Sequence, residues 1–162
     1  DQKLFCHMEE IDYCWKNYLM GYENRIIPSS VIYHKGAQTL GYNNAYKTYL
    51  NHRNSIILLL TNFELSRSLL TFCLRFILEI VSSLANLIRL RPINFIYHYR
   101  TFFFLLFNLP YLFQRRKFIK NIRIVNDKGI FKQKVIFKNS IVRKYFLLNK
   151  KYFNNINNNR RK

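Results

Sequence analysis

The sequence predicts an α/β segment, followed by a mostly helical, apolar region and then a basic tail. Residues 8–20 have helical periodicity, and residues 31–34 form a short β-branched and aromatic run typical of a strand. Residues 55–113 consist of long apolar runs interrupted by isolated charges. Residues 114–162 contain 16 Lys and Arg and one acid, Asp127.

The composition limits the classes of protein to which the chain can belong. Its formal net charge is +19, while 49% of its 162 residues are hydrophobic and 17% are aromatic. Apolar side chains require burial and the cations require water or an anionic partner, which predicts binding to nucleic acid or to an anionic membrane surface. The three cysteines have no disulfide or metal-ligand spacing, and no apolar signal segment opens the chain. Both observations argue against a secreted, disulfide-stapled domain and favour reduced thiols.

Residues 8–20 are predicted to form a helix with one apolar face, made of Ile11, Cys14, Trp15, Tyr18 and Leu19. Gly21 is the expected stop, since glycine enters a left-handed cap without steric cost. Glu9 and Glu10 fall in the first turn, where the helix dipole favours negative charge. Local pattern alone leaves two interpretations open. The carboxylates either compensate the helix dipole or act on a substrate, as a general base, hydroxyl acceptor or metal ligand.

A turn at Pro28 precedes the predicted strand at residues 31–34, which ends before Gly36. His34 stands at the end of this strand, with either a structural role or a functional one. Two further short strands are predicted at residues 122–125 and 134–137, around a turn at residues 126–129. From about Asn154 onward the chain is mostly Asn and cation, which predicts disorder.

The apolar region contains a stretch, residues 69–88, that is long enough to cross a bilayer. Arg75 and Glu79 lie inside it, four residues apart, and are expected to pair on one helical face. Because charges inside a spanning helix are costly, an interfacial or re-entrant helix is favoured over a full span. Pro92 is expected to break the helix, and residues 93–113 to restart it. The alternative is a buried helical hairpin of a soluble protein.

Five groups of residues occur in an order that resembles the C-terminal part of bacterial glycosyltransferase family 2 enzymes. That part shows an E-D/E-x-D-L-x-W-R segment, a glycine-aromatic step, a proline turn, a Y-H-x-G-G strand end and a Y-x-x-R-N entry to a helical tail. The matching positions here are residues 7–16, Gly21 with Tyr22, Pro28, residues 31–36 and residues 47–54. Glu10 replaces the more frequent Asp, Lys16 the usual Arg and Ala37 the second Gly.

The resemblance implies a GT-A fold and an inverting transfer of a sugar from a nucleotide-sugar donor to a hydroxyl acceptor, in surface polysaccharide or glycolipid synthesis. It implies that Glu10 is the general base and that Glu9 and Asp12 orient the acceptor and the loop. The implied substrate-binding residues are Trp15, Lys16, His34 and Arg53, with His34 also a candidate metal ligand.

The chain changes character at Ser55, and together with the resemblance this predicts three parts: the C-terminal end of a GT-A catalytic domain (residues 1–54), apolar membrane-associated helices (55–121) and the basic tail (122–162). A divalent metal, Mg²⁺ or Mn²⁺, is expected in the full-length enzyme. The nucleotide-binding half, with its D-x-D motif, is expected before residue 1, so this chain alone should be inactive. The expected location is the cytoplasmic face of the bacterial inner membrane, with an anionic membrane surface rather than nucleic acid as partner.

The principal alternative is a non-catalytic basic protein that binds a membrane surface or nucleic acid. Its aromatic residues fall mostly in apolar blocks instead of alternating with cations, which argues against stacking on bases. A decaying gene remnant is a third interpretation.

Overall fold

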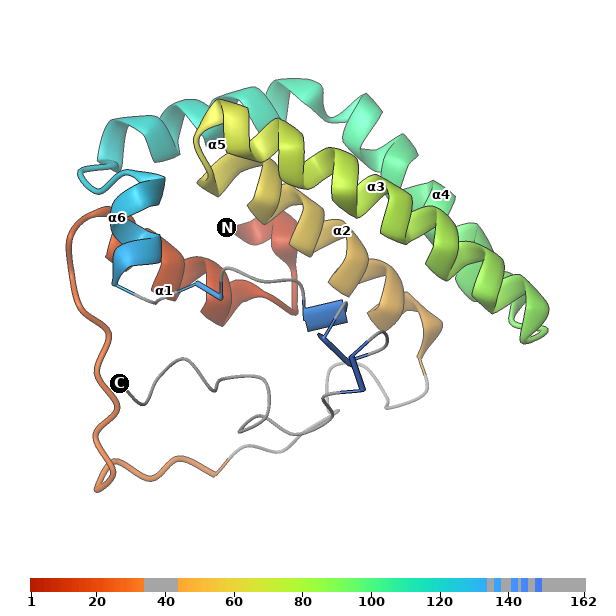
Figure 1. Ribbon diagram of the computed structural model, residues 1–162, viewed down its shortest axis with the longest axis horizontal. Coiled ribbons are helices and arrows are strands. Elements are labelled where there is room, and N and C mark those ends of the chain that lie inside the picture. Colours follow the sequence, from red (N-terminus) through yellow and green to blue (C-terminus); the bar gives the residue numbers. More distant parts are fainter. Residues whose placement is uncertain (34–43, 134–135, 138–140, 143, 146–147, 150–162) are drawn as a thin grey trace. The chain divides into compact units, whose positions relative to one another are not determined.

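A computed structural model describes residues 1–33, 44–133, 136–137, 141–142, 144–145 and 148–149. The chain divides into two compact units, Asp1–Asn126 and Asp127–Lys162. The first unit contains the short 3-10 helix η1 (Gln2–Leu4) and five α-helices (Figure 1). They are α1 (Glu9–Leu19), α2 (Ala45–Asn62), α3 (Leu65–Ile88), α4 (Pro92–Phe107) and α5 (Leu109–Ile122). The second unit contains α6 (Asp127–Lys132).

Helix α2 is the centre of the first unit. It packs against α1, α3, α4 and α5, and more extensively against α4 than against α1. The core of the unit gathers side chains from η1, α2, α4 and α5, namely Leu4, Ile56, Ile57, Leu58, Leu105 and Leu112. Helix α2 also runs without interruption through residues 54 and 55, where the sequence had suggested a domain boundary.

The predicted α/β class is wrong for the part of the chain that the structure describes, where every regular element is a helix. Val31, Ile32 and Tyr33 form no strand and are 68%, 87% and 93% exposed. A β-branched run needs a neighbouring strand to satisfy its backbone, and no described segment provides one. The GT-A remnant expected from the resemblance is therefore not present as a sheet in these residues. His34 and residues 134–135 lie outside the described residues.

The strand predicted at residues 122–125 is also wrong. Ile122 is the last residue of α5. The backbone N–H groups of Ile124 and Val125 both donate to the carbonyl oxygen of Leu19, at 2.8 and 2.9 Å. Leu19 is the last residue of α1, whose terminal carbonyls lack partners within the helix. The segment thus caps a helix instead of pairing with a strand.

The helix predictions are largely confirmed. Helix α1 ends as expected, with Gly21 in the left-handed region (φ 85°), and Pro92 opens α4. The single helix predicted over residues 93–113 is instead two helices that meet at Asn108. Pro110 lies in the first turn of α5, where its missing N–H costs nothing, and it disfavours a continuous helix through the preceding residues.

The buried residues of helix α3 are polar, and most of its apolar residues are exposed. Ser68, Glu79 and Ser83 are each 1% exposed, whereas Leu74 and Ile77 are 56% and 57% exposed. By length and composition alone, α3 (Leu65–Ile88) is long and apolar enough to cross a membrane.

Candidate functional site

The acidic cluster of α1 separates into exposed and buried carboxylates. Glu9 and Glu10 lie in the first turn of the helix and are exposed. Asp12, two residues later, is only 3% exposed. Its carboxylate accepts hydrogen bonds from the Nδ2 group of Asn62 (3.0 Å) and from the guanidinium of Arg115, and pairs with Lys16 Nζ at 2.7 Å.

Asp12 therefore joins α1 to both α2 and α5. The guanidinium of Arg115 also contacts the carboxylate of Asp1, and its Nε donates to Thr61 Oγ1 at 2.9 Å. Burial alone would raise the pKa of Asp12, but the hydrogen bonds from Asn62 and Lys16 and the charge of Arg115 hold it below its ordinary value. Asp12 is thus an ionised anchor whose oxygens are occupied by the protein.

The backbone directly before α1 is strained. Phe5, His7 and Met8 have φ angles of 63°, 69° and 70°, a region that residues with a Cβ rarely adopt. Such strain costs on the order of 1–3 kcal/mol per residue and persists only where the surroundings enforce it.

Arg53 and Asn54 of α2 enforce this conformation. Arg53 Nη2 donates to the carbonyl oxygens of Lys3 (2.8 Å) and Leu4 (3.0 Å). Asn54 Nδ2 lies 2.9, 2.9 and 2.8 Å from the carbonyl oxygens of Leu4, Cys6 and His7. Both side chains are buried, and Arg53 Nε donates to Asn54 Oδ1 at 2.9 Å. Arg53 and Asn54 thus fix the backbone of residues 5–8, which leads directly into the first turn of α1 and its residues Glu9 and Glu10.

The structure places the remaining predicted substrate-binding residues of α1 in packing roles. Trp15 is half-buried and meets Phe63 edge-on, with ring centroids 4.7 Å apart. Lys16 pairs with Asp12 and lies beside Phe118. Ile11, expected on the apolar face, is 52% exposed. His34 lies outside the described residues, so its position is not defined.

A divalent cation such as Mg²⁺ or Mn²⁺ does not fit the carboxylates of α1, and the resemblance implies a D-x-D motif, not these carboxylates, as the metal site. These cations prefer several carboxylate and carbonyl oxygens. Asp12 is already neutralised by Arg115 and Lys16, whose positive charges would repel a divalent cation. Glu9 and Glu10 alone are two exposed carboxylates, so no reaction step is assigned to a metal at this cluster.

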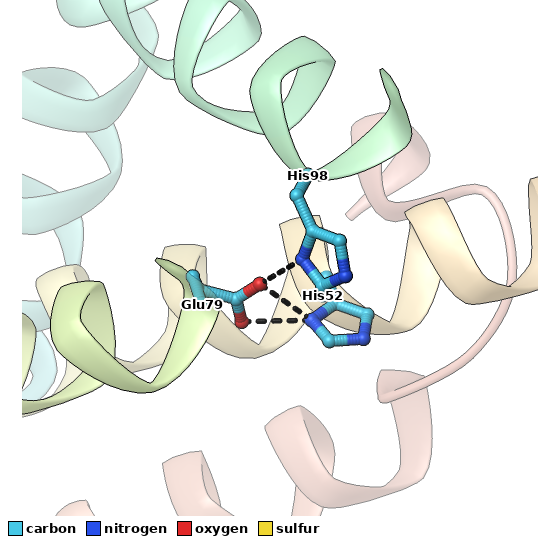
Figure 2. A group of neighbouring side chains, drawn as sticks. All are labelled: His52, Glu79 and His98. Carbon is cyan, nitrogen blue, oxygen red and sulfur yellow. Dashed lines mark hydrogen bonds and ion pairs between the residues drawn. The ribbon is translucent and has the colours of Figure 1, made fainter. Parts of the chain in front are cut away.

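A second polar cluster lies between α2, α3 and α4 and consists of His52, Glu79 and His98 (Figure 2). Glu79 is buried, and its carboxylate faces both imidazoles from one side, while the two rings lie edge-on with centroids 4.4 Å apart. His52 Nδ1 is 2.7 Å from both Glu79 oxygens, and His98 Nδ1 is 2.5 Å from Oε2. Arg75 Nε donates to Oε1 at 2.6 Å. One carboxylate thus connects three helices.

The ligand atoms of this cluster lie within 4.8 Å of one another, a spacing that could hold a metal ion. Two features oppose that role. First, each imidazole donates from Nδ1 to the ionised Glu79, so the Nδ1 atom carries a proton and has no free lone pair for a metal. Second, the guanidinium of Arg75 pairs with the same carboxylate, and its positive charge would repel a cation. The Nε2 atom of His98 lies 3.2 Å from Asn86 Nδ2, which can donate to it. The arrangement is that of a hydrogen-bonded clamp between helices.

The clamp predicts a loss of stability in acid. Burial alone would raise the pKa of Glu79, but the hydrogen bonds from His52 and His98 and the charge of Arg75 outweigh it and bring the pKa far below its ordinary value of 4.5. A pKa that is lower in the folded state stabilises the fold above the ordinary value, and this stability is lost as pH falls toward the folded-state pKa. The free energy of unfolding should therefore decrease below about pH 4.5.

Urea unfolding followed across this pH range checks the prediction. In Glu79→Gln the decrease in the free energy of unfolding on acidification should be smaller than in the wild type. Glu23→Gln is the matched control, because Glu23 is exposed and, among the described residues, pairs with the nearby and likewise exposed Arg25. Identical acid dependence in wild type and Glu79→Gln would contradict the clamp.

Both polar networks include residues that the sequence interpretation missed. For the Glu79 clamp a signal was available. Ser68, Arg75, Glu79, Ser83 and Asn86 recur at helical spacing within an apolar run and so mark one face of α3. For Arg115 no local signal exists. It belongs to a run of three cations, residues 115–117, and nothing in the sequence says that Arg115 is buried while Lys117 is exposed.

Comparison with protein families, with curated proteins and with solved structures gives no match.

Proposed function

We propose that the chain forms the acceptor side of a glycosyltransferase that moves a sugar from a nucleotide-sugar donor to a hydroxyl acceptor in surface polysaccharide or glycolipid synthesis. The donor-binding part, with its metal motif, is not contained in these 162 residues, so the chain alone is proposed to be inactive. The proposed place of work is the cytoplasmic face of a bacterial inner membrane, because nucleotide sugars are cytoplasmic.

One observation carries this proposal. The two segments of the family resemblance that lie farthest apart in the sequence, residues 7–16 and residues 47–54, are in direct contact. The side-chain amide of Asn54 donates hydrogen bonds to the carbonyl oxygens of Cys6 and His7, which lie just before Met8 and the two glutamates Glu9 and Glu10. A buried pair that fixes strained backbone next to exposed carboxylates is typical of a positioned site. A solvated helix start would not need it.

In this proposal Glu10 is the general base. Its carboxylate takes the proton of the acceptor hydroxyl as the acceptor oxygen forms a bond to the anomeric carbon of the donor sugar. The bond from that carbon to the nucleoside diphosphate breaks, and the diphosphate leaves with the electron pair. The reaction inverts the configuration at the anomeric carbon. Glu10 suits this role because it is exposed in the first turn of α1, where its carboxylate is accessible to an acceptor hydroxyl.

Asp12 has a positioning role instead of the acceptor contact expected from the sequence. Its buried pairing with Arg115 fixes the rotation of α1 about its axis. The directions of Glu9 and Glu10 follow from that rotation, since both precede Asp12 by less than one helical turn.

The experiment that tests the proposal is a transfer assay with the full-length protein. Membranes from cells that produce it are incubated with a panel of nucleotide sugars, each labelled in the sugar, and the lipid and polysaccharide fractions are counted. Label from at least one donor is expected in one of these fractions above the level of membranes that lack the protein. Absence of transfer from every donor would contradict the proposal.

A further inference from the structure

Helix α3 has an apolar face that the described residues of its own unit leave uncovered. Its exposed residues recur every three and four positions and form one stripe, Leu70, Leu74, Ile77, Val81, Leu84 and Ile88. Each is between 49% and 82% exposed. The opposite face holds the buried polar residues Ser68, Glu79 and Ser83, at 1% each. The polarity of this helix is therefore inverted relative to the surface helix of a soluble protein, which faces water with its polar side.

Helix α4 shows the same inversion. His98 and Thr101 face the interior at 2% and 0% exposure, while Phe103, Leu106 and Phe107 are 58%, 60% and 77% exposed. Helices α3 and α4 pack side by side (Figure 1), and Phe76 meets Phe102 edge-on between them, with centroids 5.0 Å apart. The uncovered apolar surface thus extends over two adjacent helices, and uncovered surfaces of that extent mark an interaction site.

The charges around this surface define the partner. Between residues 65 and 107 the only acid is Glu79, which is buried. The cations Arg89 and Arg91 are exposed where α3 ends and α4 begins. An anionic surface would therefore meet cations and apolar side chains with no exposed carboxylate on either helix.

We propose that the exposed face of α3 and α4 docks on an anionic lipid bilayer, with the apolar stripe inserted at the level between headgroups and acyl chains. The helices lie along the surface instead of crossing it. Arg75 stands near the middle of α3 with its side chain 29% exposed, and a charge at that position opposes a full span. Helix α5, which packs on the same central helix α2, exposes Lys117 and Lys120, which also belong in water or at headgroups.

A second copy of the chain fits this face less well. A stripe with steps of three and four residues could in principle pair with itself as a coiled coil. Two copies, however, would each bring a net charge of +19, and the exposed charges within α3 and α4 themselves are all cationic. Like charges oppose association in water, whereas an anionic bilayer neutralises them.

Flotation of the purified chain with lipid vesicles tests the proposal. Vesicles of phosphatidylcholine alone are compared with vesicles that also contain phosphatidylglycerol. The double variant Leu74→Glu/Ile77→Glu places two carboxylates on the stripe, and Ile26→Glu/Ile32→Glu is the matched control, since Ile26 and Ile32 are 94% and 87% exposed outside α3 and α4. All four positions are exposed, so folding should be retained, and far-UV circular dichroism verifies this.

The wild type and the control variant should float with the vesicles that contain phosphatidylglycerol. Both should bind more weakly to vesicles of phosphatidylcholine alone. The stripe variant should bind at least about tenfold more weakly, because charged groups on the inserted face oppose partition. Equal flotation of the stripe variant would overturn the proposal. A wild-type chain that does not bind vesicles but forms a dimer in solution, which the stripe substitutions dissociate, would also overturn the proposal. So would a wild-type chain that stays bound to nucleic acid at a salt concentration at which it is released from anionic vesicles. Flotation is independent of catalysis, so Glu10→Gln should float as the wild type does whatever its transfer activity.

Discussion

Replacing Arg115 by alanine should lower the free energy of unfolding of the chain by about 3 kcal/mol, because it leaves the buried carboxylate of Asp12 without its main cation. Arg115 is 6% exposed and contacts Asp12 and Asp1, and it also donates to Thr61. Asp12 would retain its ion pair with Lys16 and its hydrogen bond from Asn62. The expected loss of stability is therefore at the lower end of the range known for breaking a buried ion pair. Urea unfolding followed by far-UV circular dichroism measures it.

Lys117→Ala is the matched control for this variant. Lys117 lies two residues away on the same helix and is exposed, so its removal should change the free energy of unfolding by less than about 0.5 kcal/mol. Arg115→Lys keeps the charge but loses the forked geometry, and should fall between the wild type and Arg115→Ala. If Arg115→Ala were as stable as Lys117→Ala, the anchoring of α1 through Asp12 would be refuted.

The helices could be read from the sequence where local chemistry decides their limits. Glycine at position 21 and proline at position 92 end or open helices for reasons that do not depend on the rest of the fold. The predicted strands failed because strand formation depends on a neighbour, and no periodicity reveals whether one exists. At residues 122–125 the deciding partner was the end of α1, about one hundred residues away.

The site could be predicted only in part. Exposed Glu9 and Glu10 in a first helical turn follow from the sequence, and so does the pairing of Arg75 with Glu79. The burial of Asp12 does not, because it depends on Arg115, a partner 103 residues away in the chain. The role of Arg53 and Asn54 also depended on tertiary structure, since their acceptors are backbone carbonyls that carry no sequence signal.

The inverted polarity of α3 had a visible sequence pattern whose meaning the sequence left open. Polar residues recurring within an apolar run describe a helix with two faces, but they do not say which face is turned toward the protein. The burial of Glu79 beside His52 and His98 settles that direction. The contact of Glu79 with the two histidines, which stabilises the bundle, therefore turns the apolar stripe of α3 outward, where the proposal places the bilayer.

Substitution of Glu10 tests most directly the proposal that this residue is the base of a sugar transfer. Donor binding and sugar transfer are measured on the same preparation of the full-length protein carrying Glu10→Gln, beside Glu9→Gln and the wild type. Glu10→Gln should bind the nucleotide sugar as the wild type does but transfer it about 10²- to 10⁴-fold more slowly, since the amide cannot accept the proton. Glu9→Gln should lose less than about tenfold. Transfer by Glu10→Gln at the wild-type rate would contradict the proposal.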